Sequence, residues 1–351
     1  MARVELPIIS HNGSASLRFG EATRRSAAVQ RPRDMYADVP ILQEPTWGNE
    51  IAAYFYLGGV SSGAALLGSL ASLFGGKERQ SLAHTAHYVA FATMLPCPAL
   101  LIMDLGKRSR FHHMLRIFKP SSPMNFGAWI LTMDGMFTTL AALRALGRER
   151  QVPVLTGVAR FGATAVVEVL DMPPALGLGG YTGVLIGTTS IPVWYTSPLI
   201  GALFMASALS TGIAATSLAG SLLGREGPTD QRLLAGLERT AGIMEMGLLS
   251  GYLATTGSAA KPLLRGKFGA MLGGAVAASS AAVALAGLGR KGDEDKRRRL
   301  GRSSAALTLV GGALLRWSIV LAGKASARDR EGTLQAMTPS QEAPGWGNGR
   351  P

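Results

Sequence analysis

Glu50 and Tyr54 are four residues apart, which places a carboxylate and a phenol on one face of a helix. The carboxylate can take up a proton, and the phenol can donate or accept a hydrogen bond. Tyr181, in the sequence GGYTGVLIG, adds a second phenol between glycines that let a flat ring approach the backbone. These groups suit a quinol head group, which needs a partner at each hydroxyl and an apolar slot for its tail. Tyrosines near the ends of membrane spans also serve as interface anchors, so both roles stay open.

The elements that position these residues are predicted to be membrane helices. The chain has 351 residues, of which 47% are hydrophobic and only 16% are charged, and the apolar residues form long blocks. Such blocks are typical of membrane spans, and the 45 glycines suit the close packing of helices in lipid. The sequence therefore predicts an all-α, polytopic bundle of about eight transmembrane helices. Their expected ranges are 50–74, 83–103, 127–146, 156–187, 197–222, 233–256, 267–289 and 303–323.

Polar segments flank this expected bundle. We predict a polar N-terminal tail over residues 1–46, a transmembrane domain over 47–329 and a polar C-terminal tail over 330–351. The formal net charge of +13 is carried between the apolar blocks and in the tails, as expected for contact with anionic lipid head groups. We therefore expect a lipid bilayer, and no nucleic acid, as the partner of these charges. The predicted location is the plasma (inner) membrane, crossed several times.

Ionisable residues inside membrane spans are costly and are therefore functional candidates. Glu238 and Arg160 lie near span ends, where a structural role is the simpler interpretation. We expect Arg316, in the last span, to form a structural ion pair with an interior carboxylate, either Glu245 or Asp134. The fourth span is interrupted by Asp171 and two prolines, which indicates an interior position. The candidates for a proton path are Asp104, Asp134, Glu168, Asp171 and Glu245.

Metal and haem sites are disfavoured by the remaining residue types. The single cysteine, Cys97, cannot assemble a ligand set for zinc or an iron–sulfur cluster. A membrane haem needs two imidazoles from opposite sides, but only His84 and His87 approach a span, and they share one helix face. The sequence predicts no haem and no metal in this chain, so any cluster belongs to a partner.

Several segments in order resemble the NrfD family, the membrane subunits of polysulfide-reductase-type and related molybdopterin oxidoreductase complexes. The most specific is the basic loop between the second and third spans, MDLGKRSRFHHMLRIFKPSSPMNFGAW at 103–129. It keeps aromatic residues and methionines among its arginines, which indicates a folded cap rather than a flexible linker. The other segments are YFYLGGVSSGAALL at 54–67, YTGVLIG at 181–187, PVWYTSPLIGALFMASALSTGIA at 192–214 and LVGGALLRWSIVLAGKASARD at 309–329.

The resemblance implies an eight-span, haem-free bundle that binds menaquinol or ubiquinol near one surface. It maps the head-group site to Glu50, Tyr54 and Tyr181. Electrons would pass to or from a ferredoxin-like iron–sulfur subunit, which serves a catalytic redox subunit of molybdopterin type. The protein would not be catalytic alone. We expect the loop 104–126 to dock the iron–sulfur subunit through Arg110 and Arg116.

Two other functions remain open at this point. The interior acids Asp134, Glu168, Asp171 and Glu245 suit a proton-translocating or transporter-like unit, because relays of this kind occur in pumps. The protein could instead be a purely structural membrane anchor, although Glu50, Tyr54 and Tyr181 speak for an active pocket.

Overall fold

A computed structural model describes residues 41–150, 157, 164–289 and 293–337 of the chain. Every regular element within these ranges is a helix, as predicted. Predicted features in the N-terminal 40 residues and Arg160 lie outside them. The long helices are α2 (Asn49–Phe74), α3 (Gln80–Met94) with α4 (Cys97–Met103), α6 (Pro123–Arg150), α8 (Thr164–Gly187), α10 (Ile200–Leu223), α11 (Pro228–Thr256), α13 (Gly266–Gly289) and α14 (Glu294–Arg328).

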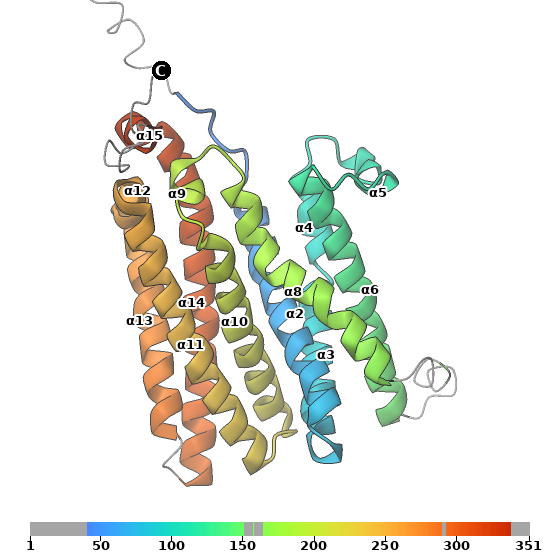
Figure 1. Cartoon of the computed structure of the whole chain (residues 1–351). Coiled ribbons are helices and arrows are strands. Elements are labelled where there is room, and N and C mark those ends of the chain that lie inside the picture. The colour runs from blue at the N-terminus through green and yellow to red at the C-terminus, as the bar shows by residue number, and fades with distance from the viewer. Residues whose placement is uncertain (1–40, 151–156, 158–163, 290–292, 338–351) are drawn as a thin grey trace, which may run out of the picture. The chain divides into compact units, whose positions relative to one another are not determined.

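Six helical segments in the described ranges are long and apolar enough to cross a membrane: α2, α3 with α4, α6, α10, α13 and α14. The protein is therefore a multi-pass membrane protein, as predicted. Helices α8 and α11 have 24 and 29 residues and run within the same bundle (Figure 1). The predicted number of eight spans stays a prediction.

Short helices cap the end of the bundle at which α2 begins. They are α5 (His113–Arg116) in the basic loop, α9 (Pro192–Tyr195), α12 (Lys261–Leu264) and α15 (Arg330–Met337), which occupies the start of the predicted C-terminal tail (Figure 1). The 3₁₀ helix η4 (Arg108–Arg110) lies in the same basic loop. At the opposite end, short described connections join α2 to α3 and α10 to α11.

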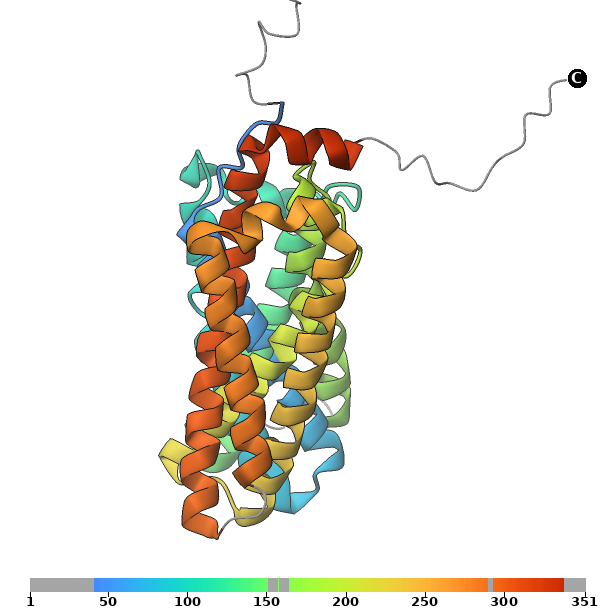
Figure 2. The same cartoon turned by 90° about the vertical axis from the view of Figure 1, so that its left-hand side faces the viewer.

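Helix α2 is the centre of the helical arrangement, and α13 lies at its margin. Of the six membrane-length segments, α2 is the most buried and α13 the least. Helices α13, α14 and α11 stand together on one side of α2, and α3, α6 and α8 on the other (Figures 1 and 2). A Cβ atom at Gly63 of α2 would overlap the backbone of Ala208 in α10, and one at Gly212 would overlap the backbone of Gly63. Small residues thus allow close backbone contact, as expected in lipid.

Arg316 of α14 connects three helices inside this core. Its guanidinium is 1% exposed and donates hydrogen bonds to the carbonyl of Phe55 in α2 and to the carbonyl of Phe204 in α10, the latter at 2.9 Å. The same group lies over the Phe204 ring, 5.0 Å from its centroid. Gly59 leaves room for it, because a Cβ atom there would overlap the guanidinium. Glu245 interacts with Arg316 electrostatically, but no described carboxylate lies within 4.0 Å of it.

We predict that Arg316→Leu destabilises the bundle, because two buried carbonyls lose a charged donor. The expected loss is about 1–3 kcal/mol in the free energy of unfolding, seen as a lower thermal midpoint in detergent. Arg328→Leu, at an exposed position of the same helix, is the matched control. Equal midpoints for the two variants would contradict this role of Arg316.

Candidate functional site

The structure brings Tyr54 and Tyr181 together inside the end of the bundle that carries the basic loop. Their side chains are 2% and 8% exposed, and the two phenols interact electrostatically. Asp134 of α6 and Cys97 of α4 also interact with the Tyr54 phenol. Four helices therefore contribute side chains to one cluster, which spacing along the sequence does not reveal.

Tyr181 is held against the first turn of α6. Its hydroxyl donates a hydrogen bond to the carbonyl of Pro123, and its ring packs edge-on against Phe126 with 6.2 Å between centroids. A Cβ atom at Gly127 would overlap the Tyr181 ring, so only glycine permits this position. Gly127 is a site residue that the sequence analysis did not identify.

An apolar groove of about 700 Å³ lies between α6 and α8, and Tyr181 forms part of its wall. Its lining is mostly aromatic, aliphatic and proline side chains, with Tyr181 and Thr188 as the hydroxyl groups. Pro173 and Pro174 lie in its wall, but α8 continues through them, so the predicted interruption of this span by Asp171 and the prolines is wrong. A mostly apolar slot with few polar groups is typical of a site for a hydrophobic ligand.

Glu50 lies one turn before Tyr54 but has different neighbours. Its carboxylate folds toward Gly48 at the start of α2, and it interacts electrostatically with Asp104 in the basic loop. Burial and the Glu50 charge raise the pKa of Asp104, while Lys324 lowers it. Glu50 is not among the residues that line the groove. The predicted trio is thus divided between a tyrosine pair and an acidic pair nearer the surface.

Three of the predicted proton-path residues, Asp134, Asp171 and Glu168, lie close together between α6, α8 and α2. Asp134 is fully buried and interacts electrostatically with Asp171, which accepts a hydrogen bond of 3.0 Å from Ser69. Glu168 lies 3.3 Å from Nε2 of His87. Neither oxygen of Asp134 has a hydrogen-bond partner within the described residues, so a negative charge there would be costly.

A second set of groups continues this line toward the opposite end of the bundle. His84, one turn before His87, contacts Glu149 through Nδ1 at 2.9 Å. Glu149 also accepts hydrogen bonds from Tyr88 and from Arg225, the latter at 3.0 and 3.2 Å. We call Glu149, His84, His87, Glu168, Asp171 and Asp134 the inner column. From the sequence, both histidines are considered only as haem ligands, and their contacts with acids are not predicted.

Glu245 belongs to a different part of the core. It accepts a hydrogen bond of 2.5 Å from Ser210 and faces Arg316, between α10, α11 and α14. Asp104 is at the loop surface beside Glu50. The five predicted proton-path residues therefore occupy three places.

The basic loop is folded around Asn125. Its side chain accepts a hydrogen bond of 2.7 Å from the backbone of Lys119 and donates to the carbonyls of Met114 and Ile117 at 2.6 and 3.0 Å. Arg110 and Arg116 are exposed, beside exposed apolar side chains such as Ile117. Asn125 therefore holds the loop in its fold, a role that the charge pattern of the sequence does not indicate.

No group of three or more histidine, cysteine or acidic side chains placed to hold a metal ion occurs in the described ranges.

Comparison with known proteins agrees with this architecture. The protein is 23% identical to a selenate reductase subunit of Mesobacillus selenatarsenatis, over 48% of its own length and 46% of that relative's. It is 25% identical to a polysulfide reductase chain of Wolinella succinogenes, over 54% of its own length and 62% of the relative's. A third relative, the Hdr-like menaquinol oxidoreductase integral membrane subunit of Archaeoglobus fulgidus, is 26% identical over 34% and 31%.

These matches span between 31% and 62% of the relatives' own lengths. A family model described as "Polysulphide reductase, NrfD" matches residues 40–327, which run from before α2 to the last turn of α14. The protein therefore belongs to the NrfD family of integral membrane proteins.

Proposed function

We propose that this protein is the quinone-reactive membrane subunit of a multisubunit oxidoreductase. Its part of the reaction is QH2 ⇌ Q + 2H+ + 2e−, with the electrons exchanged with a partner. The observation that carries the proposal is the apolar groove of about 700 Å³ with the Tyr181 phenol in its wall. Its size and lining fit a menaquinone or ubiquinone, which supplies the two-electron chemistry when bound.

The relatives support this proposal through their names. One is named as the membrane subunit of a menaquinol oxidoreductase, and two are named as parts of a polysulfide reductase and of a selenate reductase. Transferred to this protein, these names favour quinol chemistry and a separate catalytic subunit. We propose an iron–sulfur subunit between the two, and a molybdopterin-type catalytic partner.

Within the groove, Tyr181 acts as the polar anchor. Its hydroxyl, which donates to the Pro123 carbonyl, exchanges this partner for a head-group oxygen. The neighbouring Tyr54 and Asp134 are positioned to pass on a proton, because a phenol and a carboxyl group can each donate and accept. Asp104 can hold a proton nearer the surface, where burial and the neighbouring Glu50 charge favour its neutral form.

A second function, proton translocation, is favoured by the inner column. It extends from the tyrosine pair to Glu149 at the other end of the bundle and includes two histidines and three buried acids. A pH change during turnover that persists when the quinone site is blocked would favour an independent transport unit. One that disappears on blocking would favour coupling to quinol chemistry.

We predict that Tyr181→Phe weakens quinol binding by about fivefold to a hundredfold, because it removes a hydrogen bond and can leave a buried acceptor unpaired, a loss of about 1–3 kcal/mol. Glu50→Gln keeps the shape of the side chain but removes a proton acceptor, so it slows oxidation more than it weakens binding. The measurement is quinol titration of the assembled complex in membranes, after the cluster content has been checked.

Tyr56→Phe is the matched control. Tyr56 is also in α2, but its phenol points away from Tyr181 and donates a hydrogen bond to the carbonyl of Leu309 in α14. Gly127→Ala, which displaces the Tyr181 ring without removing its hydroxyl, should resemble Tyr181→Phe. Unchanged affinity and turnover in the Tyr181 and Glu50 variants would place the quinone elsewhere.

We predict that the double change Arg110→Glu and Arg116→Glu weakens assembly with the iron–sulfur subunit while leaving membrane insertion intact, because it reverses charge on an exposed surface of the basic loop. The measurement is co-purification of the partner. Asn125→Ala should have the same effect by loosening the loop. The matched control is Arg265→Glu with Lys267→Glu, an exposed basic pair near α12. Normal co-purification of the loop variant would rule out docking at this surface.

A further inference from the structure

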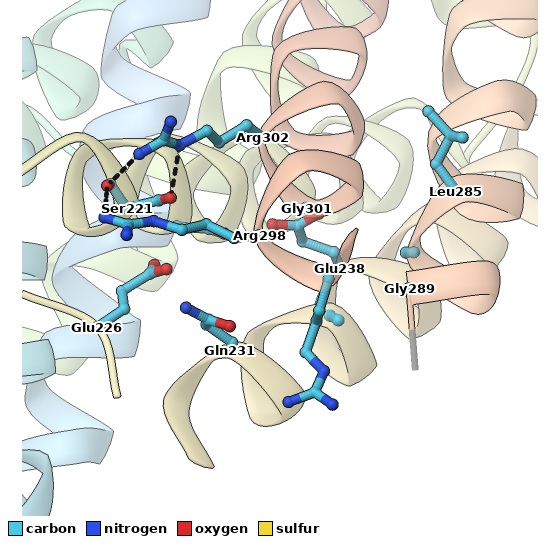
Figure 3. A pocket seen from close by; sticks show the side chains of 13 residues that line it. Ser221, Glu226, Gln231, Glu238, Leu285, Gly289, Arg298, Gly301 and Arg302 are labelled. Carbon is cyan, nitrogen blue, oxygen red and sulfur yellow. Dashed lines mark hydrogen bonds between the residues drawn. The ribbon is translucent and has the colours of Figure 1, made fainter. Parts of the chain in front are cut away.

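A polar pocket, separate from the apolar groove, lies at the opposite end of the bundle from Tyr54 and Tyr181. It is enclosed by α10, α11, α13, α14 and the turn between α10 and α11, and its volume is about 20 Å³. Glu226 of the turn, Gln231 and Glu238 of α11, and Arg298 and Arg302 of α14 line it (Figure 3). None of these residues belongs to the groove or to the inner column.

The two arginines bind the C-terminal end of α10 through hydrogen bonds. Arg302 donates to the hydroxyl and the carbonyl of Ser221 at 2.8 and 2.7 Å, and Arg298 donates to the same carbonyl at 2.9 Å (Figure 3). This is the arrangement expected where cationic side chains satisfy the last carbonyls of a helix. Neither arginine forms an ion pair within 4.0 Å with a described carboxylate.

Three oxygen atoms in the pocket lack a hydrogen-bond donor among the described residues. One carboxylate oxygen of Glu238 accepts a hydrogen bond of 3.0 Å from Ser304, but its Oε1 atom has no partner among the described residues. The Oε1 atoms of Glu226 and Gln231 are also buried without a partner there. Glu238 is 4% exposed, and Glu226 and Gln231 point toward the same space below Arg298 (Figure 3).

The protons available to these oxygens can be counted. A space of about 20 Å³ holds roughly one water molecule, which donates two hydrogen bonds at most. That water cannot serve three acceptors at once, and although Arg297 in the lining can supply a further donor, the two carboxyl groups remain close together in one small buried space. Turning the Gln231 amide over removes one acceptor but leaves two carboxylates around the same small space, and two carboxylates that share a site do not both stay ionised.

We propose that Glu226 and Glu238 form a proton-binding site that takes up one proton from the membrane face opposite the groove, with one water between the carboxyl groups. The nearby positive charges of Arg298 and Arg302 disfavour a metal cation in this space. Glu245 lies seven residues beyond Glu238 on the same face of α11, so the site is the outer end of a polar line that leads toward Arg316. It does not depend on the proposed quinone site.

The charged groups on every surrounding element agree with uptake near neutral pH. Burial, Glu238 and Asp230 raise the pKa of Glu226 to about 8, while Arg298 and Arg302 lower it. Arg297 of α14 also lines the pocket, whereas α10 contributes Ser217 and Ser221, and α13 contributes Leu285, Ala286 and Gly289. Because the folded-state pKa of Glu226 is raised, its contribution to stability is complete below the pKa of an unfolded glutamate and is lost as pH rises through about 8.

The test is infrared titration of the full-length protein in nanodiscs, which follows the carbonyl stretch of protonated carboxyl groups. We expect a carboxyl band that disappears with a midpoint near pH 8 and is absent in Glu226→Gln. In Glu238→Gln the band should titrate at lower pH, because one neighbouring negative charge has been removed. Glu78→Gln, an exposed acid in a turn at the same end of the bundle, is the matched control and should leave the band unchanged.

Thermal unfolding gives a second readout that does not require the band to be assigned. Glu226→Gln should be more stable than the parent protein above pH 8, and this advantage should vanish toward pH 5, with the control variant equal to the parent throughout. The proposal is overturned if the parent lacks a band that depends on Glu226, or if Glu226→Gln is no more stable at high pH. A band whose midpoint moves when sodium replaces choline would overturn it in favour of a metal cation.

Discussion

The position of the site depends on the Arg316 guanidinium and the two backbone carbonyls that it binds. In the core of a membrane protein, a buried cation must be satisfied by other protein groups, and the carbonyls of Phe55 and Phe204 provide them. Since Phe55 follows Tyr54 directly, the same interaction that joins α14 to α2 and α10 fixes the turn of α2 that carries the tyrosine. Gly59 and the glycine contact between α2 and α10 permit this packing.

Helix α2 separates the acidic residues of the core into two groups. On one side, Asp134, Asp171 and Glu168 form the inner column with His87 and extend from the tyrosine pair toward Glu149. On the other side, Glu238 and Glu245 lie with serine hydroxyls between α10, α11 and α14. Each group reaches the end of the bundle opposite the groove, so the arrangement suits chemistry at one membrane face with protons exchanged at the other.

Composition and the length of the apolar blocks were sufficient to predict a polytopic helical bundle, because transfer of apolar residues into lipid sets the length of each helix. Placing Tyr54 and Tyr181 in one site required the NrfD resemblance, because helical spacing relates Tyr54 only to Glu50. Contacts between helices could not be predicted, because no local sequence pattern determines them. Gly127 makes room for the Tyr181 ring, the Asn125 side chain holds the basic loop, and the Glu149 carboxylate contacts the His84 ring. Each of these contacts forms only when the helices pack together.

The central claim is that the groove between α6 and α8 holds the quinone. The most direct measurement is photolabelling of the assembled complex in membranes with an azido-quinone, followed by mass spectrometry of the labelled peptides. The account predicts label on the peptides of α6 and α8 that line the groove, including the one with Tyr181, and its loss when excess unlabelled quinone competes. Competable label confined to α10, α11, α13 and α14 would contradict it.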